Sequence, residues 1–186
     1  MKLGIIIAST RPERKGSILG QWFYEQARQH SGVEASLIEL ADVNLPLLDE
    51  SGHPRLQQYE HAHTKAWSDQ VAALDAFVFV TPEYNFGTPP ALNNALNYLY
   101  KEWNYKPAGF VSYGGISGGT RSVEMTKQIL GALKVVPLVE AVTIPFFAKH
   151  LTDAQTFEAN DIQIQAAANL VKELQRWHGA LKTLRA

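Results

Sequence analysis

The chain has 186 residues, a formal net charge of −1, 46% hydrophobic residues and 19% charged residues. These values predict one compact domain over residues 1–186, and the near-zero charge favours neither nucleic acid nor a charged membrane surface as a partner. The chain has no cysteine, which excludes a disulfide framework, a thiolate nucleophile and iron–sulfur ligation. No apolar stretch approaches the ~20 residues that cross a bilayer, and Met1 leads directly into an apolar run, so we expect a cytoplasmic protein without a signal peptide.

The first part of the chain predicts two strands with a helix between them. Leu3–Ile7 is a continuous apolar run, typical of a strand covered on both faces. Ser17 can cap the helix that follows, and Glu34–Leu40 alternates weakly as a second strand. Ala41–Pro54 is polar, and we expect an irregular loop that tucks three apolar side chains inward, those of Leu45, Leu47 and Leu48.

The alternation continues to the end of the chain. A helix around Leu56–Leu74 leads into a third strand at Ala76–Thr81, and leucines at helical spacing predict a helix over Leu92–Leu99. The remaining predicted elements are a strand at Ala108–Tyr113, a helix at Arg121–Leu133, a strand at Val135–Thr143 and a final helix at about Asp161–Lys182.

Strands that alternate with helices predict a parallel, doubly wound sheet in an α/β three-layer sandwich. Five β-α units fit a five-stranded sheet in the order 2-1-3-4-5, and they are too few for the six-stranded dinucleotide-binding order. In the five-stranded order, the loops after strands 1, 3 and 4 converge at the switch point where open sheets bind ligands. The sequence therefore predicts a single site built from these three loops.

The first of these loops, residues 8–17, combines hydroxyls and cations with the start of a helix. Its hydroxyls are those of Ser9, Thr10 and Ser17, and its cations are Arg11, Arg14 and Lys15. A helix N-terminus and a cationic loop suit a phosphate dianion. Because Lys15 precedes Gly16, the loop is not a Walker A motif, and it has no G-x-G-x-x-G pattern. The alternative interpretation is a solvated basic turn.

The second and third loops suit a planar ring. Pro82-Glu-Tyr-Asn-Phe86 offers aromatic side chains for stacking, and its prolines stiffen the loop. The third loop, Gly114-Gly-Ile-Ser-Gly-Gly119, permits close approach of the backbone to a ligand. Taken together, a phosphate socket, a ring-binding wall and a glycine floor fit flavin mononucleotide (FMN) better than they fit a bare phosphate.

These motifs resemble those of the NAD(P)H-dependent FMN reductase family, whose fold is flavodoxin-like. Ser9-Thr-Arg-Pro-Glu-Arg-x-Gly16 is similar to the family's phosphate loop, and Pro82-Glu-Tyr-Asn85 to its flavin-ring motif. Gly114-Gly-x-Ser-Gly-Gly119 is similar to the third flavin loop of the family. The resemblance covers essentially the whole chain in element order.

The resemblance implies a set of FMN-binding residues. The phosphate would be held by Ser9, Arg11 and Ser17, with the backbone of Ile18 and Leu19. The flavin ring would contact the second loop at Pro82, Glu83, Tyr84 and Asn85. The third loop would cover the ring with Gly114, Gly115 and Ser117. Two positions depart from the family pattern: Ala8 stands where a glycine is frequent, and Leu19 stands where asparagine is frequent, so that only the Leu19 backbone can replace the asparagine contact.

The resemblance also implies an activity: hydride transfer from NADPH or NADH to FMN, and then electron transfer to a small-molecule acceptor. The acceptor is left open among quinones, azo compounds, metal oxyanions and free flavin. The flavin performs the chemistry, so no side chain is named as a catalyst, and we expect no metal site. The family implies a homodimer or homotetramer, and we expect the loop around Leu45–Pro54 to border the active site.

Other interpretations stay open on the sequence alone. A flavodoxin-type electron carrier without its own NAD(P)H reaction is the main alternative, and a phosphate-ester hydrolase is a weaker one because a nucleophile and an acidic cluster are missing. His61 and His63 lie two apart and should not share a face of the predicted helix. The aromatic cluster of Tyr98, Tyr100, Trp103 and Tyr105 fits either core packing or a dimer contact.

Overall fold

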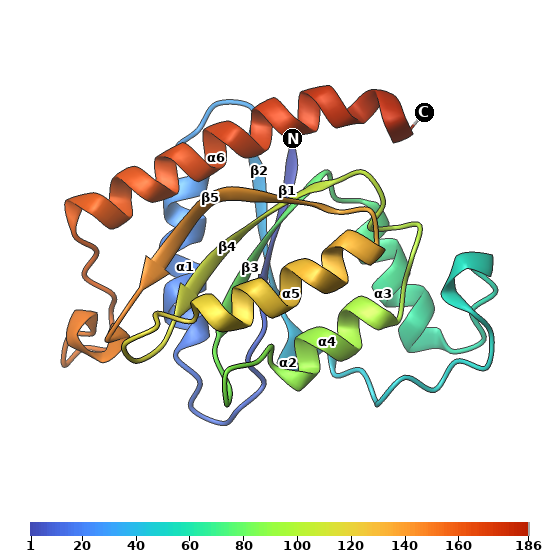
Figure 1. The fold of residues 1–186 in the computed structure, drawn as a ribbon, viewed down its shortest axis with the longest axis horizontal. Helices are drawn as coiled ribbons and strands as arrows, with labels where there is room; N and C mark the ends of the chain where they lie inside the picture. Colours follow the sequence, from blue (N-terminus) through green and yellow to red (C-terminus); the bar gives the residue numbers. More distant parts are fainter. Residues whose placement is uncertain (186) are drawn as a thin grey trace.

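The computed structural model describes residues 1–185, and Ala186 of the expected domain lies outside the described residues. Five parallel strands form one sheet in the order β2-β1-β3-β4-β5, which confirms the predicted order (Figure 1). The strands are β1 (Lys2–Ile7), β2 (Glu34–Glu39), β3 (Ala76–Pro82), β4 (Pro107–Tyr113) and β5 (Val136–Ile144).

Helices cover both faces of the sheet. One face packs against α1 (Gly16–Ala27) and α6 (Asp161–Leu181), and the other against α3 (Ala62–Ala72), α4 (Pro90–Asn97) and α5 (Thr120–Ala132). The remaining short helices are α2 (Leu40–Val43), η1 (Pro54–Leu56), η2 (Phe147–His150) and η3 (Lys182–Arg185). This arrangement is the predicted flavodoxin-like, three-layer sandwich.

Alternation along the central strands divides the core into two halves. In β3, Phe77 and Phe79 face the α3–α5 side, whereas Val78 and Val80 face the α1–α6 side. All four side chains are fully buried, and burial of each such side chain contributes about 1.5–3 kcal/mol. Gly109 of β4 allows α6 to approach the sheet, because a β-carbon there would lie 2.4 Å from Leu170 Cδ1.

The loop between α2 and η1 differs from the prediction. Leu47 and Leu48 are 84% and 43% exposed, so the expectation that they tuck inward is wrong, although Leu45 does pack against the core. The Asn94 side chain explains the difference: its amide nitrogen donates to Pro46 O at 2.7 Å, and its oxygen accepts from Leu48 N at 3.0 Å. These two bonds fix the backbone with the leucine side chains directed outward.

Two helices begin at other residues than predicted. Helix α1 begins at Gly16 with Lys15 at the N-cap position and no side-chain cap, so Ser17 lies inside the first turn. Helix α3 begins at Ala62 rather than near Leu56. The Glu50 carboxylate accepts from the backbone N–H groups of Glu60 and His61, at 2.8 and 3.1 Å, and thereby fixes an extended approach to α3.

The aromatic and histidine clusters have local explanations. Tyr98 and Trp103 are fully buried, which places them in the core, and the Trp103 ring lies 4.9 Å from that of Phe77. The His61 and His63 rings stack at 5.1 Å, contrary to prediction, because His61 precedes the first turn of α3. Among residues 1–185, no helix is both long and apolar enough to span a membrane.

Candidate active site

The loops after β1, β3 and β4 meet at the carboxyl edge of the sheet, the lower edge in Figure 1. They border a cavity of about 440 Å³, which we call the three-loop cavity. Its lining residues are Ser9, Arg11, Pro12, Glu13, Arg14, Lys15, Pro82, Glu83, Tyr84, Tyr113, Gly114, Gly115 and Phe147. The volume lies within the range of small-molecule clefts, about 300–1,000 Å³.

The first two loops hold each other directly. The buried Ser9 hydroxyl and the Tyr84 hydroxyl are 2.6 Å apart and share a hydrogen bond. The Arg11 guanidinium lies 5.9 Å from the centre of the Tyr84 ring, within the range of a cation–π contact. These contacts place a cation beside an aromatic ring at the mouth of the cavity.

The basic residues of the first loop differ in their partners. Arg14 Nε donates to Glu39 Oε2 at 2.9 Å, so a carboxylate balances its charge. Lys15 Nζ donates to the neutral side-chain amide of Gln155 at 2.6 Å. Arg11 and Lys15 therefore supply the positive charge that this end of the cavity offers to an anion.

A network centred on Glu83 joins the second and third loops, and we call it the loop clamp. Glu83 accepts from Ser117 Oγ at 2.9 Å, from Arg121 Nε at 2.6 Å and from Arg121 N at 3.2 Å. Burial alone would raise the pKa of Glu83, but the bonds from Arg121 and Ser117 outweigh it and hold this pKa below its usual value. The Glu83 carboxylate is therefore ionised, and Ser117 and Arg121 are its bonding partners.

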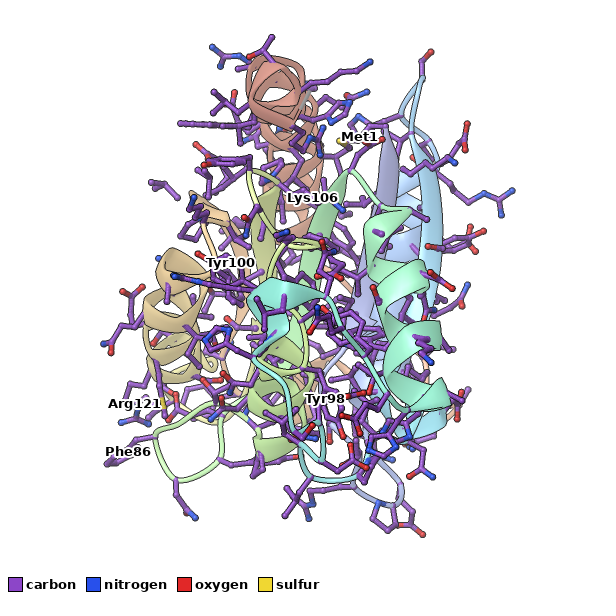
Figure 2. The ribbon with its side chains drawn as sticks, turned by 90° about the vertical axis from the view of Figure 1, so that its right-hand side faces the viewer. Met1, Phe86, Tyr98, Tyr100, Lys106 and Arg121 are labelled. Carbon is purple, nitrogen blue, oxygen red and sulfur yellow. The ribbon has the colours of Figure 1, made fainter. Side chains whose placement is uncertain are left out.

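The guanidinium of the clamp also covers an exposed ring. Arg121 lies 3.8 Å from the centre of the Phe86 ring, and Figure 2 shows both side chains at the same outer edge of the molecule. Arg121 could not be singled out from its local sequence, because Glu83 and Phe86 lie in a loop far from it along the chain.

Glycines form the floor of the cavity. A β-carbon at Gly115 would meet no atom within 4 Å, so the space above this residue is open. At Gly119, φ is +84° and a β-carbon would lie 2.9 Å from both the backbone nitrogen and the backbone oxygen of Tyr113, so only glycine fits. The third loop thus combines a tight turn with an uncovered surface that can accept a flat ligand.

The predicted site residues are distributed unevenly around this cavity. Its lining includes Ser9, Arg11, Pro82, Glu83, Tyr84, Gly114 and Gly115. Ser117 does not line the cavity, but its hydroxyl donates to Glu83, which does. Asn85 is exposed, and its φ is 49°. Ser17 and Ile18 line a neighbouring groove, Leu19 is fully buried, and the N–H groups of Ile18 and Leu19 point to Lys15 O at 3.2 and 3.4 Å.

Tyr113 and Phe147 line the cavity but were not predicted. Their rings make an edge-to-face contact at 5.3 Å. Burial raises the pKa of Tyr113, so its hydroxyl stays protonated. Tyr113 could have been predicted from the sequence, because a tyrosine at the end of a buried strand places its hydroxyl at the strand end, where the site lies. No sequence pattern predicted Phe147, since it follows Pro145 in a segment that we expected to be irregular.

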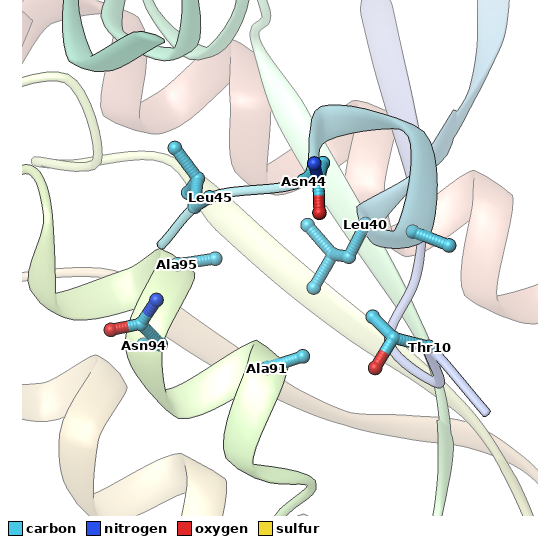
Figure 3. A pocket seen from close by; sticks show the side chains of 8 residues that line it. Thr10, Leu40, Asn44, Leu45, Ala91, Asn94 and Ala95 are labelled. Carbon is cyan, nitrogen blue, oxygen red and sulfur yellow. The ribbon is translucent and has the colours of Figure 1, made fainter. Parts of the chain in front are cut away.

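A smaller cavity of about 310 Å³ lies beside Thr10, between α2 and α4 (Figure 3). Its lining residues are Thr10, Leu40, Ala41, Asn44, Leu45, Ala91, Asn94 and Ala95. All of these side chains are uncharged, so this cavity does not suit a phosphate. Within residues 1–185, no group of three or more histidine, cysteine, aspartate or glutamate side chains could hold a metal ion.

Known proteins resemble this chain over most of its length. The family model for NADPH-dependent FMN reductase matches residues 1–149. The chain is 40% identical over 148 residues to an NAD(P)H-dependent FMN reductase of Schizosaccharomyces pombe, covering 77% of this chain and 74% of the relative. It is 30% identical over 179 residues to the FMN-dependent NADPH-azoreductase of Staphylococcus aureus, covering 91% and 90%.

Among solved structures, the flavoenzyme NAD(P)H:(acceptor) oxidoreductase FerB of Paracoccus denitrificans superposes with a TM-score of 0.76. The two chains are 20% identical, and the match covers 96% of this chain and 97% of FerB. This likeness shows a shared fold.

Proposed function

The chain belongs to the NADPH-dependent FMN reductase family, and on this premise we propose that the three-loop cavity holds FMN. The protein is an FMN-dependent oxidoreductase that uses NAD(P)H as electron donor. When bound, FMN supplies the capacity to accept a hydride and to pass electrons on to an acceptor. The remaining tasks fall to the side chains and backbone of this chain.

The observation that carries the proposal is the meeting of three different surfaces in one cavity. Arg11 and Lys15 provide positive charge at one end, Tyr84 provides an aromatic ring, and Gly115 leaves open space on the third loop. FMN has a phosphate at one end and a flat ring at the other, so the two ends of this ligand match the cationic and the aromatic parts of the cavity.

We assign the phosphate to Ser9 and Arg11, and the first turn of α1, from Ser17 to Leu19, adds the positive end of a helix dipole. We assign the ring to the segment from Pro82 to Asn85 and to the glycines Gly114 and Gly115. Ser117 and Glu83 act through the loop clamp, because their side chains bind each other and Arg121.

The side chains around the ring orient the ligand and exclude water. Tyr113 and Phe147 close one side of the cavity with packed rings. Glu83 is held as an anion by Arg121 and Ser117. None of these groups needs to transfer a proton during hydride transfer, so we assign no acid or base.

For the assembly, we propose a cytoplasmic homodimer or homotetramer of a single-domain chain. Large apolar side chains at the carboxyl edge support an interface: Leu47, Phe86 and Ile116 are 84%, 67% and 79% exposed. Apolar side chains in this number around a ligand site suit a subunit contact. Light scattering at micromolar concentration should give at least a dimer, and a monomer would contradict the interface.

Anaerobic titration of the FMN-loaded protein with NADPH and then NADH tests the activity. We expect the visible flavin absorbance to bleach and to return on addition of a quinone or an azo compound, and the rates of return should rank these acceptors. A flavin that binds and stays oxidised with both donors would indicate the electron carrier, and failure to bind FMN would overturn the proposed site.

A further inference from the structure

A second groove runs along the outer side of α1, next to the three-loop cavity. It has a volume of about 510 Å³, and we call it the α1 groove. Its lining residues are Ser17, Ile18, Gln21, Trp22, Glu25, Gln155, Thr156 and Phe157. One wall is α1, and the other is a short turn after β5 that is closed by a bond from Thr152 N to Thr156 O at 3.0 Å.

Two aromatic rings form the floor of the α1 groove. Trp22 and Phe157 meet edge to face at 5.0 Å, and both are half-buried, so each ring keeps an accessible surface. The amides of Gln21 and Gln155 lie at the rim, and amides both donate and accept hydrogen bonds. Aromatic surface with a rim of amides is suited to a flat heteroaromatic base.

The α1 groove and the three-loop cavity share a boundary at Lys15. Lys15 lines the three-loop cavity, and its ammonium donates to Gln155 Oε1 in the wall of the groove at 2.6 Å. Because its partner in this bond is neutral, Lys15 keeps a positive charge for a phosphate that crosses the boundary. Glu25 lies in the lining of the groove as well; its Oε1 accepts from Gln21 Nε2 at 2.9 Å, and its Oε2 pairs with Arg28 Nη1 at 3.4 Å.

We propose that the α1 groove binds the adenosine half of the nicotinamide dinucleotide, while the nicotinamide lies against the accessible face of the flavin proposed for the three-loop cavity. The pyrophosphate then passes Lys15, the adenine lies against Trp22 and Phe157, and the Glu25 carboxylate accepts from a ribose hydroxyl. This inference rests on the proposed function, which makes the dinucleotide the donor.

Binding of AMP to the FMN-loaded protein, measured by calorimetry, tests the groove without any reaction. We expect Trp22→Ala and Phe157→Ala each to weaken AMP binding about tenfold, the scale of stacking between a base and an aromatic ring. Tyr24→Ala is the matched control, because it removes a ring from α1 that does not line the groove, and it should leave AMP binding unchanged. Circular dichroism and FMN affinity check that each variant is folded.

Kinetics with two donors separate the groove from general damage. Reduced nicotinamide mononucleotide lacks the adenosine half, so Trp22→Ala should lower kcat/KM about tenfold for NADH and leave it unchanged for this shorter donor.

Three results would overturn the inference: equal losses with both donors, no loss with either, or an effect confined to the KM of the electron acceptor, which would assign the groove to the acceptor. If the unaltered protein is reduced by neither donor, the proposed function fails instead, and AMP binding still reports on the groove.

Discussion

Both edges of the sheet border a cavity, but they differ in how their charged side chains are bonded. At the amino edge, two buried charged side chains bond to other groups of the protein, whereas at the carboxyl edge Arg11 and Lys15 have no carboxylate partner among the bonds of the described residues. Glu102 is 5% exposed and accepts from Gln57, Tyr59 and Ser68 at 3.0, 2.9 and 2.8 Å. Lys106 is 6% exposed and donates to the backbone carbonyl groups at the end of α3. In Figure 2, Lys106 and Met1 lie toward one end of the molecule and Phe86 and Arg121 toward the other.

Polar and charged side chains have different roles at the two edges. At the amino edge, the partners of each charge belong to the protein, so the bonds contribute to the free energy of folding. At the carboxyl edge, Arg11, Lys15 and the glycine floor leave binding capacity toward the cavity, and a ligand must supply the partner. Variants at the amino edge should therefore change stability, and variants at the carboxyl edge should change FMN affinity.

Glu102→Ala is expected to have the largest effect. It removes the charged acceptor of three side-chain hydrogen bonds, from Gln57, Tyr59 and Ser68, and we expect the free energy of unfolding to fall by about 3 kcal/mol. Urea denaturation measures this loss, and the FMN dissociation constant of the folded protein should stay the same. Weaker FMN binding at unchanged stability would break the comparison between the two edges.

Arg11→Ala should act in the opposite way. Loss of a charge-assisted phosphate contact should weaken FMN binding by about 1.5–3 kcal/mol and leave the free energy of unfolding of the cofactor-free protein nearly unchanged. Riboflavin, which has no phosphate, is the control ligand, and the variant should bind it as the original protein does. An equal loss for both ligands would remove Arg11 from the phosphate site.

Two glycines that have open space around a β-carbon give a matched pair. Gly115→Ala adds a methyl group where the flavin ring is proposed to lie, and it should weaken FMN binding by about 1 kcal/mol. Gly131→Ala, within α5, should leave FMN binding unchanged and raise stability by about 0.5–1 kcal/mol. Thermal unfolding and FMN titration of both variants measure these effects. Equal FMN affinities of the two variants would contradict the proposed position of the flavin ring beside Gly115.

The smallest expected effect is a pH dependence at Lys106. Burial, and then the charge of Arg185, lowers the pKa of Lys106 from 10.5 to about 8. Between these two values the unfolded chain holds more protons at this group, so its contribution to the free energy of unfolding rises with pH. The stability of the original protein relative to Lys106→Met should rise by about 0.4 kcal/mol from pH 8 to 8.5. If the difference in free energy of unfolding between the two proteins, measured by urea denaturation, does not change with pH, the lowered pKa of Lys106 is contradicted.

The fold was predictable because its signals are local. Each central strand is a continuous apolar run, and each of the three site loops follows such a run directly. Contacts between distant segments were not predictable: Asn94 turns Leu47 and Leu48 outward, and Arg121 pairs with Glu83. The aromatic wall at Phe147 depends on a turn whose position is set by the packed sheet, and no pattern within the chain encodes it.

The contact between Ser9 and Tyr84 has a consequence for how the cofactor is kept. Because this bond and the loop clamp already join the three loops, little conformational freedom is lost when FMN arrives. The energy of the contacts is then available for a long residence time. FMN on this scaffold is suited to act as a prosthetic group that stays through many turnovers, while donor and acceptor come and go as diffusing substrates.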